Sequence, residues 1–306
     1  MTGSGVLNGG APAHAGGADT VTLVEGGTFC LSDRHGDITP HRSQGLFFRD
    51  ARVLSRWELR LDGASPEPLT VQTPEAFTGQ FISRRTPTAG RADSTVLITR
   101  ERLVADGMRE TVLVHNLDRE STVVTLTLHV DGDFADLFAV KEGRASGSST
   151  ETSVVDGELV LRERGESMRG LVVTASGDPI MSPGSLTWRT VIEPGQKWQT
   201  EIVVQPTWGN RKLSTRFERG ERPERSGPGR KIERWRNSAT NIDTDHVSLS
   251  AALQQTESDL GALLMHDEGD SRRSFVAAGA PWFMTLFGRD SLLTAWMALP
   301  LEVALS

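Results

Sequence analysis

The segment from Ala278 to Ser291 places aromatic side chains beside an arginine and an aspartate. It reads Ala-Gly-Ala-Pro-Trp-Phe-Met-Thr-Leu-Phe-Gly-Arg-Asp-Ser. The rings of Trp282 and Phe287 offer large apolar faces, on which the C–H face of a sugar can stack. Arg289 presents a rigid fork of hydrogen-bond donors and Asp290 presents two acceptor oxygens, so the pair can hold two neighbouring hydroxyls. These residue types point to the binding of a sugar.

A loop followed by a helix must position these residues. Gly279 and Pro281 break any preceding helix, and the apolar spacing that follows predicts a helix over 291–299. The Arg–Asp pair would then lie at a loop-to-helix junction, where binding residues are common. The same pattern also fits a buried helix start with an Arg–Asp ion pair, because aromatic clusters usually belong to a core.

Two further segments carry a resemblance to a known family. Residues 44–57 read Gln-Gly-Leu-Phe-Phe-Arg-Asp-Ala-Arg-Val-Leu-Ser-Arg-Trp, and residues 133–141 read Asp-Phe-Ala-Asp-Leu-Phe-Ala-Val-Lys. Both resemble segments of the N-terminal domain of glycogen-debranching enzymes of the amylo-α-1,6-glucosidase type, although threonine would be more usual than Ala51. Residues 278–291 resemble the start of the catalytic domain of the same family. The three segments occur in the family's order.

The resemblance implies a mainly β fold, in which an antiparallel, supersandwich-like β-sandwich precedes an (α/α)6 barrel. It also implies hydrolysis of α-1,6 branches with inversion. The family's catalytic carboxylates come later than any segment of this chain, so we expect a truncated barrel and no catalytic residue here. We expect the chain alone not to hydrolyse glucans. The alternative is a non-catalytic glucan-binding or assembly module that pairs with a separate barrel chain.

The resemblance also assigns residues to roles. Arg289 and Asp290 match a pair that holds the terminal sugar in related inverting glycosidases, and Trp282 and Phe287 would complete a substrate-binding site. The expected ligand is an α-glucan such as glycogen or a maltooligosaccharide, without a cofactor. A second group, which contains Arg49, Asp50 and Arg52, is expected to form a charge network at a domain interface; direct contact of this loop with a sugar is the alternative.

Composition excludes several other classes of protein. The net charge of −7 argues against general nucleic-acid binding, and a single cysteine, Cys30, excludes an internal disulfide framework. No run approaches the roughly 18 apolar residues of a membrane helix, and the N-terminus shows no signal peptide. A cytoplasmic protein is therefore expected. Cys30 follows Phe29 in an apolar setting and should be a small buried residue.

Sequence patterns divide the chain into four parts. Residues 1–20 are Gly- and Ala-rich and predict a disordered tail, and residues 21–208 predict the sandwich. Residues 209–237 predict a basic linker with a helical part, and residues 238–306 predict the start of the barrel. The basic residues of the linker also fit a patch for an anionic partner, although few aromatic residues accompany them.

Within the second part, strands are indicated by alternating apolar residues and by turns such as Asp-Gly. The strand-like segments are Thr95–Val104, Met108–His115, Thr122–Val130, Glu158–Arg162, Leu171–Ala175, Leu186–Ile192 and Thr200–Val204. The Ser- and Gly-rich segment 143–153 predicts a mobile loop. From Ser248 the leucine spacing becomes helical and predicts the first barrel helix, with Leu264 as its last apolar position.

One cluster of possible metal ligands lies near the N-terminus. Asp33, His35, Asp37 and His41 fall within nine residues, and carboxylate and imidazole groups suit transition metals. Their spacing matches no tight metal motif, so no metal site is predicted.

Overall fold

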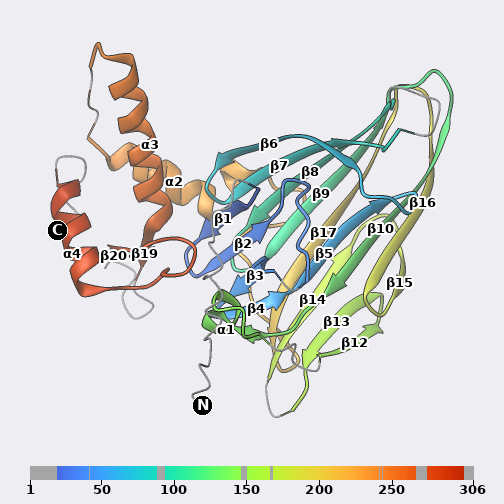
Figure 1. The fold of residues 1–306 in the computed structure, drawn as a ribbon, viewed down its shortest axis with the longest axis horizontal. Helices are drawn as coiled ribbons and strands as arrows, with labels where there is room; N and C mark the ends of the chain where they lie inside the picture. Colours follow the sequence, from blue (N-terminus) through green and yellow to red (C-terminus); the bar gives the residue numbers. More distant parts are fainter. Residues whose placement is uncertain are drawn as a thin grey trace, which may run out of the picture.

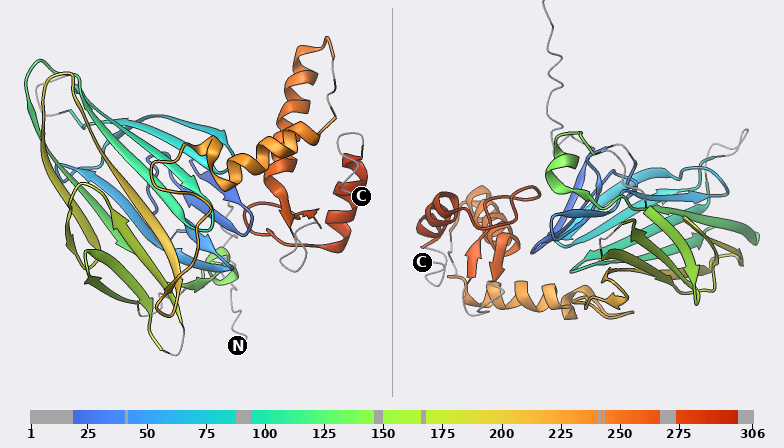
Figure 2. Two further views of the ribbon diagram at one scale, coloured as in Figure 1. Left: turned by 180° about the vertical axis from the view of Figure 1, so that it is seen from behind. Right: turned by 90° about the horizontal axis from the view of Figure 1, so that it is seen from below.

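The computed structural model describes residues 19–40, 42–87, 94–145, 150–165, 168–240, 242, 244–266 and 274–299. Figures 1 and 2 show a sandwich of antiparallel sheets, with a helical part at one end. The mainly β prediction and the sandwich are confirmed. The predicted N-terminal tail lies outside the described residues, except for Asp19 and Thr20.

The sandwich contains three sheets. The largest has the order β12-β13-β14-β17-β9-β8-β7-β6, with β18 paired to β17; the second has the order β15-β16-β10-β5; the third has the order β1-β2-β3-β4-β11. The strands are β1 (Val21–Glu25), β2 (Thr28–Ser32), β3 (Gly45–Phe48), β4 (Ala51–Leu54), β5 (Arg56–Leu61), β6 (Glu67–Glu75), β7 (Thr78–Arg84), β8 (Val96–Val104), β9 (Met108–Asn116), β10 (Thr122–Asp131), β11 (Ala135–Asp136), β12 (Thr150–Val155), β13 (Glu158–Glu163), β14 (Arg169–Ala175), β15 (Ile180–Ser182), β16 (Ser185–Ile192), β17 (Lys197–Trp208) and β18 (Arg211–Lys212).

Each strand-like segment predicted between Thr95 and Val204 coincides with one of these strands. The mobile loop predicted over 143–153 is wrong in its last part, because β12 begins at Thr150. The Thr150 hydroxyl donates a hydrogen bond to the carbonyl of Gly132 at 2.6 Å, and β12 pairs along its length with β13. Of the predicted loop, residues 146–149 lie outside the described residues.

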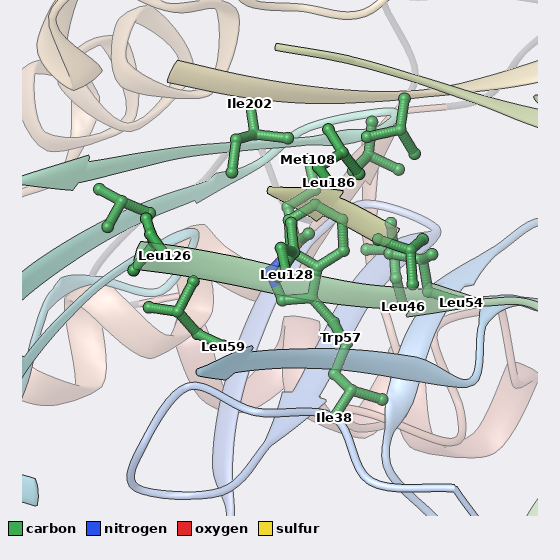
Figure 3. Packing of buried hydrophobic residues seen from close by; sticks show 14 of the residues in the cluster. Ile38, Leu46, Leu54, Trp57, Leu59, Met108, Leu126, Leu128, Leu186 and Ile202 are labelled. Atoms are coloured by element: carbon green, nitrogen blue, oxygen red, sulfur yellow. The ribbon is translucent and has the colours of Figure 1, made fainter. Parts of the chain in front are cut away.

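The core lies between the largest sheet and the sheet that contains β5 and β10. Alternate residues of β10, such as Leu126 and Leu128, are buried and face β8, β9 and β17 across the sandwich. Figure 3 shows Trp57 of β5 surrounded by aliphatic side chains, among them Leu128 and Ile38. The period-two pattern thus sets which face of each strand is buried. A shift of one residue in the pairing would expose the apolar side chains to water.

The helical part follows the sandwich. Its elements are η1 (Pro223–Arg225), α2 (Gly227–Ser238), α3 (Val247–Leu263), β19 (Leu264–His266), β20 (Ser274–Val276) and α4 (Gly288–Ala298), and a short helix α1 (Leu137–Lys141) lies earlier in the chain. Both helices predicted for this part of the chain are present, as α3 and α4. Leu264, predicted as helical, instead starts β19, which pairs with β20.

Helix α2 connects the sandwich to α3 (Figure 2). Its Ile232 and Trp235 are buried in a cluster with Leu103 of β8 and Val203 of β17, so the helix lies against the largest sheet. The indole N–H of Trp235 donates to the carbonyl of Glu257 in α3 at 2.8 Å. In the part of the chain that the structure describes, no helix is both long and apolar enough to cross a membrane.

Candidate functional site

Residues 278–291 form a closed loop that leads into α4. Phe283 donates its N–H to the carbonyl of Gly279 at 2.9 Å, and Gly279 donates back to Phe283 at 3.2 Å. At the other end, the buried Ser291 hydroxyl donates to the carbonyl of Val276 at 2.7 Å. Because α4 begins at Gly288, the Arg–Asp pair lies in its first turn.

Trp282 attaches this loop to the sandwich. Its ring is buried and meets Phe29 of β2 and Phe47 of β3 edge-on, with centroid separations of 6.0 and 5.7 Å. Phe29 and Phe47 stack on each other at 4.5 Å. Such aromatic contacts stabilise a fold by more than the burial of their apolar surface alone. Trp282 therefore holds the loop in place, and its ring is buried rather than open to a ligand.

Phe283 and Phe287 lie next to each other on the outer side of the loop. Their centroids are 5.8 Å apart, and the residues are 38% and 41% exposed. The ammonium group of Lys141, at the end of α1, lies 4.1 Å from the centre of the Phe283 ring. This separation is that of a cation–π contact. Phe287 thus remains open to a ligand, and Phe283 is shared with Lys141.

Arg289 and Asp290 are directed toward solvent. Their side chains are 83% and 43% exposed, and Arg289 Nη2 lies 3.7 Å from Asp290 Oδ1. An exposed pair at this separation contributes little to stability, so both groups retain hydrogen-bonding capacity for a ligand. The Asp290 carboxylate is also favoured by the positive end of the helix dipole. The first turn of α4 is therefore not the buried ion pair that the sequence also allowed.

The three residues of the predicted interface network do not lie together. Arg52 is buried and forms a two-pronged ion pair with Asp133, with Nε 3.0 Å from Oδ1. Its Nη1 donates to the carbonyls of Arg42 and Gln44 at 2.8 and 3.2 Å. Arg49 and Asp50 are instead exposed at the tip between β3 and β4, where the φ angles are 47° and 61°.

The three sequence motifs meet in space. Arg52 of the first pairs with Asp133 of the second, and the N–H of Leu137 in the second donates to the carbonyl of Asp50 at 2.9 Å. Phe47 of the first contacts Trp282 of the third. Lys141 of the second contacts Phe283 of the third. The loop with Arg289 and Asp290 is thus fixed by side chains from both other motifs, which chain spacing alone did not predict.

The acidic and histidine side chains of the possible metal cluster are used in the fold. Asp33 accepts the N–H groups of His35 and Asp37 at 2.8 and 2.9 Å, and its other oxygen lies 3.4 Å from His35 Nδ1. Asp37 accepts from Leu59, Arg60 and Arg100. His41 lies outside the described residues. Among those described, no group of three or more His, Cys, Asp or Glu side chains gathers around a possible ion.

The sequence interpretation missed a set of charges inside the sandwich. Glu110 of β9 is fully buried between Arg100 and Arg102 of β8 and also accepts the indole N–H of Trp57 at 3.1 Å. Burial raises the pKa of Glu110, but the two guanidinium groups outweigh it and hold that pKa below its ordinary value. The signal was present in the sequence, because both arginines share the period-two face of Val96 and Ile98.

Cys30 lies beside this set of charges. It is buried as predicted, and Arg102 Nη1 lies 3.5 Å from its sulfur. Burial raises the pKa of the Cys30 thiol. The residue therefore acts as a small core side chain rather than as a nucleophile.

The sandwich region matches a known protein family. Residues 23–203, more than half of the chain, match the family described as the N-terminal domain of (some) glycogen debranching enzymes. A comparison with curated protein sequences gave no match.

Solved structures with a similar chain path include a putative aldose 1-epimerase from Escherichia coli K12, with 8% identity and a TM-score of 0.40 over 62% of this chain and 99% of that chain. A putative kojibiose phosphorylase from the human microbiome has 10% identity and a TM-score of 0.35, over 84% of this chain and 32% of that chain. A heparan sulfate lyase from Pedobacter heparinus has 8% identity and a TM-score of 0.35, over 63% and 36%. At these TM-scores none of the three carries an argument about function.

The fold and the site define a β-sandwich protein with an attached helical segment, in which an exposed loop from one sequence motif is held by side chains of two others. The chain belongs to the family of N-terminal domains of glycogen debranching enzymes. This membership connects it with carbohydrate metabolism.

Proposed function

We propose that the chain is the N-terminal portion of a glycogen-debranching-type α-1,6-glucosidase and that residues 278–291 bind the terminal glucose of an α-glucan. The observation that supports this most is the meeting of the three motifs. In this proposal the sandwich (21–208) and the linker (209–237) serve to hold the first barrel residues (238–306) in position. Glycogen or a maltooligosaccharide is the ligand, and the cytoplasm is the compartment.

Each residue of the loop has a distinct proposed role. Arg289 donates to one sugar hydroxyl while Asp290 accepts from its neighbour, since both groups are exposed and only loosely paired. Phe287 stacks on the apolar face of the ring. Trp282 does not touch the sugar in this proposal but fixes the loop through Phe29 and Phe47.

We expect this chain by itself to bind glucan without hydrolysing it. Inverting glycosidases need an acid and a base about 6.5–9.5 Å apart, on opposite sides of the scissile bond. We assign neither role to a residue of this chain, because the family's catalytic carboxylates come later than any of its segments and Asp290 is proposed to bind substrate. Release of glucose from glycogen by a purified, uncontaminated sample would overturn this part of the proposal.

Titration of maltoheptaose into the protein, followed by calorimetry, tests the binding site. The Arg289→Ala and Asp290→Asn variants should each weaken binding at least tenfold, which corresponds to about 1.4 kcal/mol. Arg230→Ala is a matched control, since its side chain is also exposed, at 63%, and lies on α2. Equal binding by Arg289→Ala and the control would contradict the proposed site.

A second function is favoured by the apolar surface of α4. Leu292, Trp296 and Met297 are 72%, 70% and 75% exposed on this helix. An exposed apolar surface of this kind is typical of a protein contact. In this alternative the chain is a non-catalytic glucan-binding or assembly module, and a separate chain supplies further barrel helices. Glucan binding that survives removal of residues 238–306 would favour a binding site on the sandwich itself.

A further inference from the structure

A cavity of about 460 Å³ lies where the sandwich, the linker and the β19 strand come together. Gly26 and Gly27 of the β1–β2 turn and Arg49 of the β3–β4 tip line its sandwich side. Arg216 and Lys231 line it from the linker and α2, and His266 lines it from β19. These residues are not part of the proposed sugar loop.

The charges in this cavity do not cancel. The buried carboxylate of Glu25 receives Arg216 Nη1 at 2.8 Å and Lys231 Nζ at 3.2 and 3.3 Å. Arg216 Nε also donates to Asp106 at 2.6 Å. The two carboxylates are thus matched by these two cations, and Arg49 adds a third positive charge.

Arg49 has no acidic partner within the described residues. Its guanidinium carbon lies 5.4 Å from the centre of the Phe48 ring, and the structure gives it no ion pair or hydrogen bond there. An arginine stacked on an aromatic ring keeps its five N–H donors in a fixed plane. Such a fork suits a tetrahedral oxyanion, which it can bind through two parallel hydrogen bonds.

The environment of His266 is consistent with a positive potential in the cavity. Burial lowers the pKa of His266, and the charges of Lys231, Arg234 and Arg216 lower it further, against the opposing effect of Glu25. The imidazole is therefore predominantly neutral at pH 7. In that form it can still donate one N–H to an anion.

The backbone of the β3–β4 tip holds Arg49 in an unusual conformation. Arg49 and Asp50 both have positive φ, where asparagine and glycine are preferred in two-residue hairpin turns. The tip is tied to α1 by the hydrogen bond between Leu137 and Asp50. Backbone strain of this kind concentrates at functional sites.

The glycine turn leaves the opposite wall open. A Cβ atom on Gly27 would meet no heavy atom within 4 Å, and the φ angle of Gly27 is not in the left-handed region. A side chain at this position is therefore tolerated by the backbone. Position 27 offers a way to change the charge of the cavity without disturbing its structural ion pairs.

We propose that this junction cavity binds a phosphate-type anion, with Arg49 as its principal ligand. The anion is either free inorganic phosphate or the phosphate group of a phosphorylated sugar. Because the wall comes from the sandwich, α2 and β19, a bound anion would hold these three parts together. This function is separate from the sugar loop at residues 278–291.

Calorimetric titration at low salt and pH 7 tests the proposal, with inorganic phosphate and glucose 6-phosphate as probes and glucose as the uncharged control. We expect saturable binding of at least one phosphate probe and none of glucose at this site. Arg49→Gln should weaken that binding at least tenfold. Gly27→Glu should abolish it, whereas the isosteric Gly27→Gln should remain within threefold of the unmodified chain.

The two probes also distinguish the sources of the anion. Tighter binding of inorganic phosphate would assign the site to the free ion. Tighter binding of glucose 6-phosphate would assign it to a sugar phosphate, provided that Gly27→Glu abolishes this binding and so excludes the sugar loop. Thermal unfolding of each variant checks that it is folded. The proposal is overturned if neither probe binds the unmodified chain, or if folded Gly27→Glu and Gly27→Gln bind phosphate equally well.

Discussion

The sandwich and the helical part bury their side chains to very different degrees. The sandwich encloses even charged groups, and Arg102 and Glu110 are 1% and 0% exposed. In α3 only Leu260, Gly261 and Ala262 are buried, and α4 leaves most of its apolar residues in water. The sandwich is thus closed on itself, whereas the part after α2 is attached through α2 and through the contact of Trp282 with the sandwich. Stability and ligand binding should therefore respond separately to mutation.

The largest loss of stability is expected inside the sandwich. Glu110→Gln leaves Arg100 and Arg102 facing each other without their shared counter-charge. Removal of one member of a buried ionic group costs about 3–5 kcal/mol of unfolding free energy. Glu101→Gln on the same hairpin is the control, because this side chain is exposed and accepts a hydrogen bond from Gln80 at 3.1 Å. Urea unfolding curves measure both; similar midpoints would contradict the role of the buried charges.

The same variant makes a prediction about pH. Because the pKa of Glu110 is lowered in the folded state, its carboxylate stabilises the fold at pH values above its unfolded pKa, near 4.5. That contribution is lost as the pH falls through the folded pKa. The stability difference between the unmodified chain and Glu110→Gln should therefore shrink below about pH 4.5. A difference that stays constant with pH would show that the charge is not responsible.

A smaller effect is expected at the contact between the two parts. Trp282→Ala removes the ring that meets Phe29 and Phe47, and truncation of a buried tryptophan costs about 3 kcal/mol at the lower end of the usual range. We expect the loop to detach from the sandwich as a result. The helical part should then be cleaved faster by a protease, whereas the stability of the sandwich should change little. Phe275→Ala, in the partly buried β20, is a control. Unchanged proteolysis of Trp282→Ala would mean that other contacts hold the loop.

Gly45→Ala tests the packing around Arg52. A Cβ atom at position 45 would lie 2.5 Å from Arg52 Cδ and 2.9 Å from the carbonyl of Leu54. Overpacking of this kind costs about 1–3 kcal/mol. Gly27→Ala adds the same methyl group where nothing lies within 4 Å and should not destabilise the fold. If the two variants unfold at the same temperature, the close packing at Gly45 does not contribute to the stability of the fold.

The smallest effect on stability is expected on α4. Trp296→Ser removes an exposed ring and should change the free energy of unfolding by no more than about 0.5 kcal/mol. It should nevertheless reduce self-association and dye binding at high protein concentration, because it shrinks the exposed apolar surface. Light scattering and unfolding curves measure the two effects. A stability loss well above 1 kcal/mol would show that α4 is packed against the rest of the chain.

The elements of the fold were largely accessible from the sequence, and the site was only partly so. The alternation in β10 and the Asp-Gly turns predicted strands because the period of two follows from local backbone geometry. Leucine spacing likewise predicted α3. The loop expected over 143–153 was wrong at Thr150, where pairing with β13 outweighs the local composition. The domain boundaries and the sugar-binding roles of Arg289 and Asp290 stay predictions.

The sequence by itself determined the mainly β class, the buried faces of the central strands and the three family motifs. Only the tertiary structure decided that Arg52 meets Asp133, 81 residues away, and that Phe47 meets Trp282. Only the structure also shows that Arg52 lies in the interior and Arg49 on the surface, although the two are three positions apart. The physical reason is that local periodicity sets the side on which a residue lies, whereas the order of strands in a sheet sets which distant residues face each other.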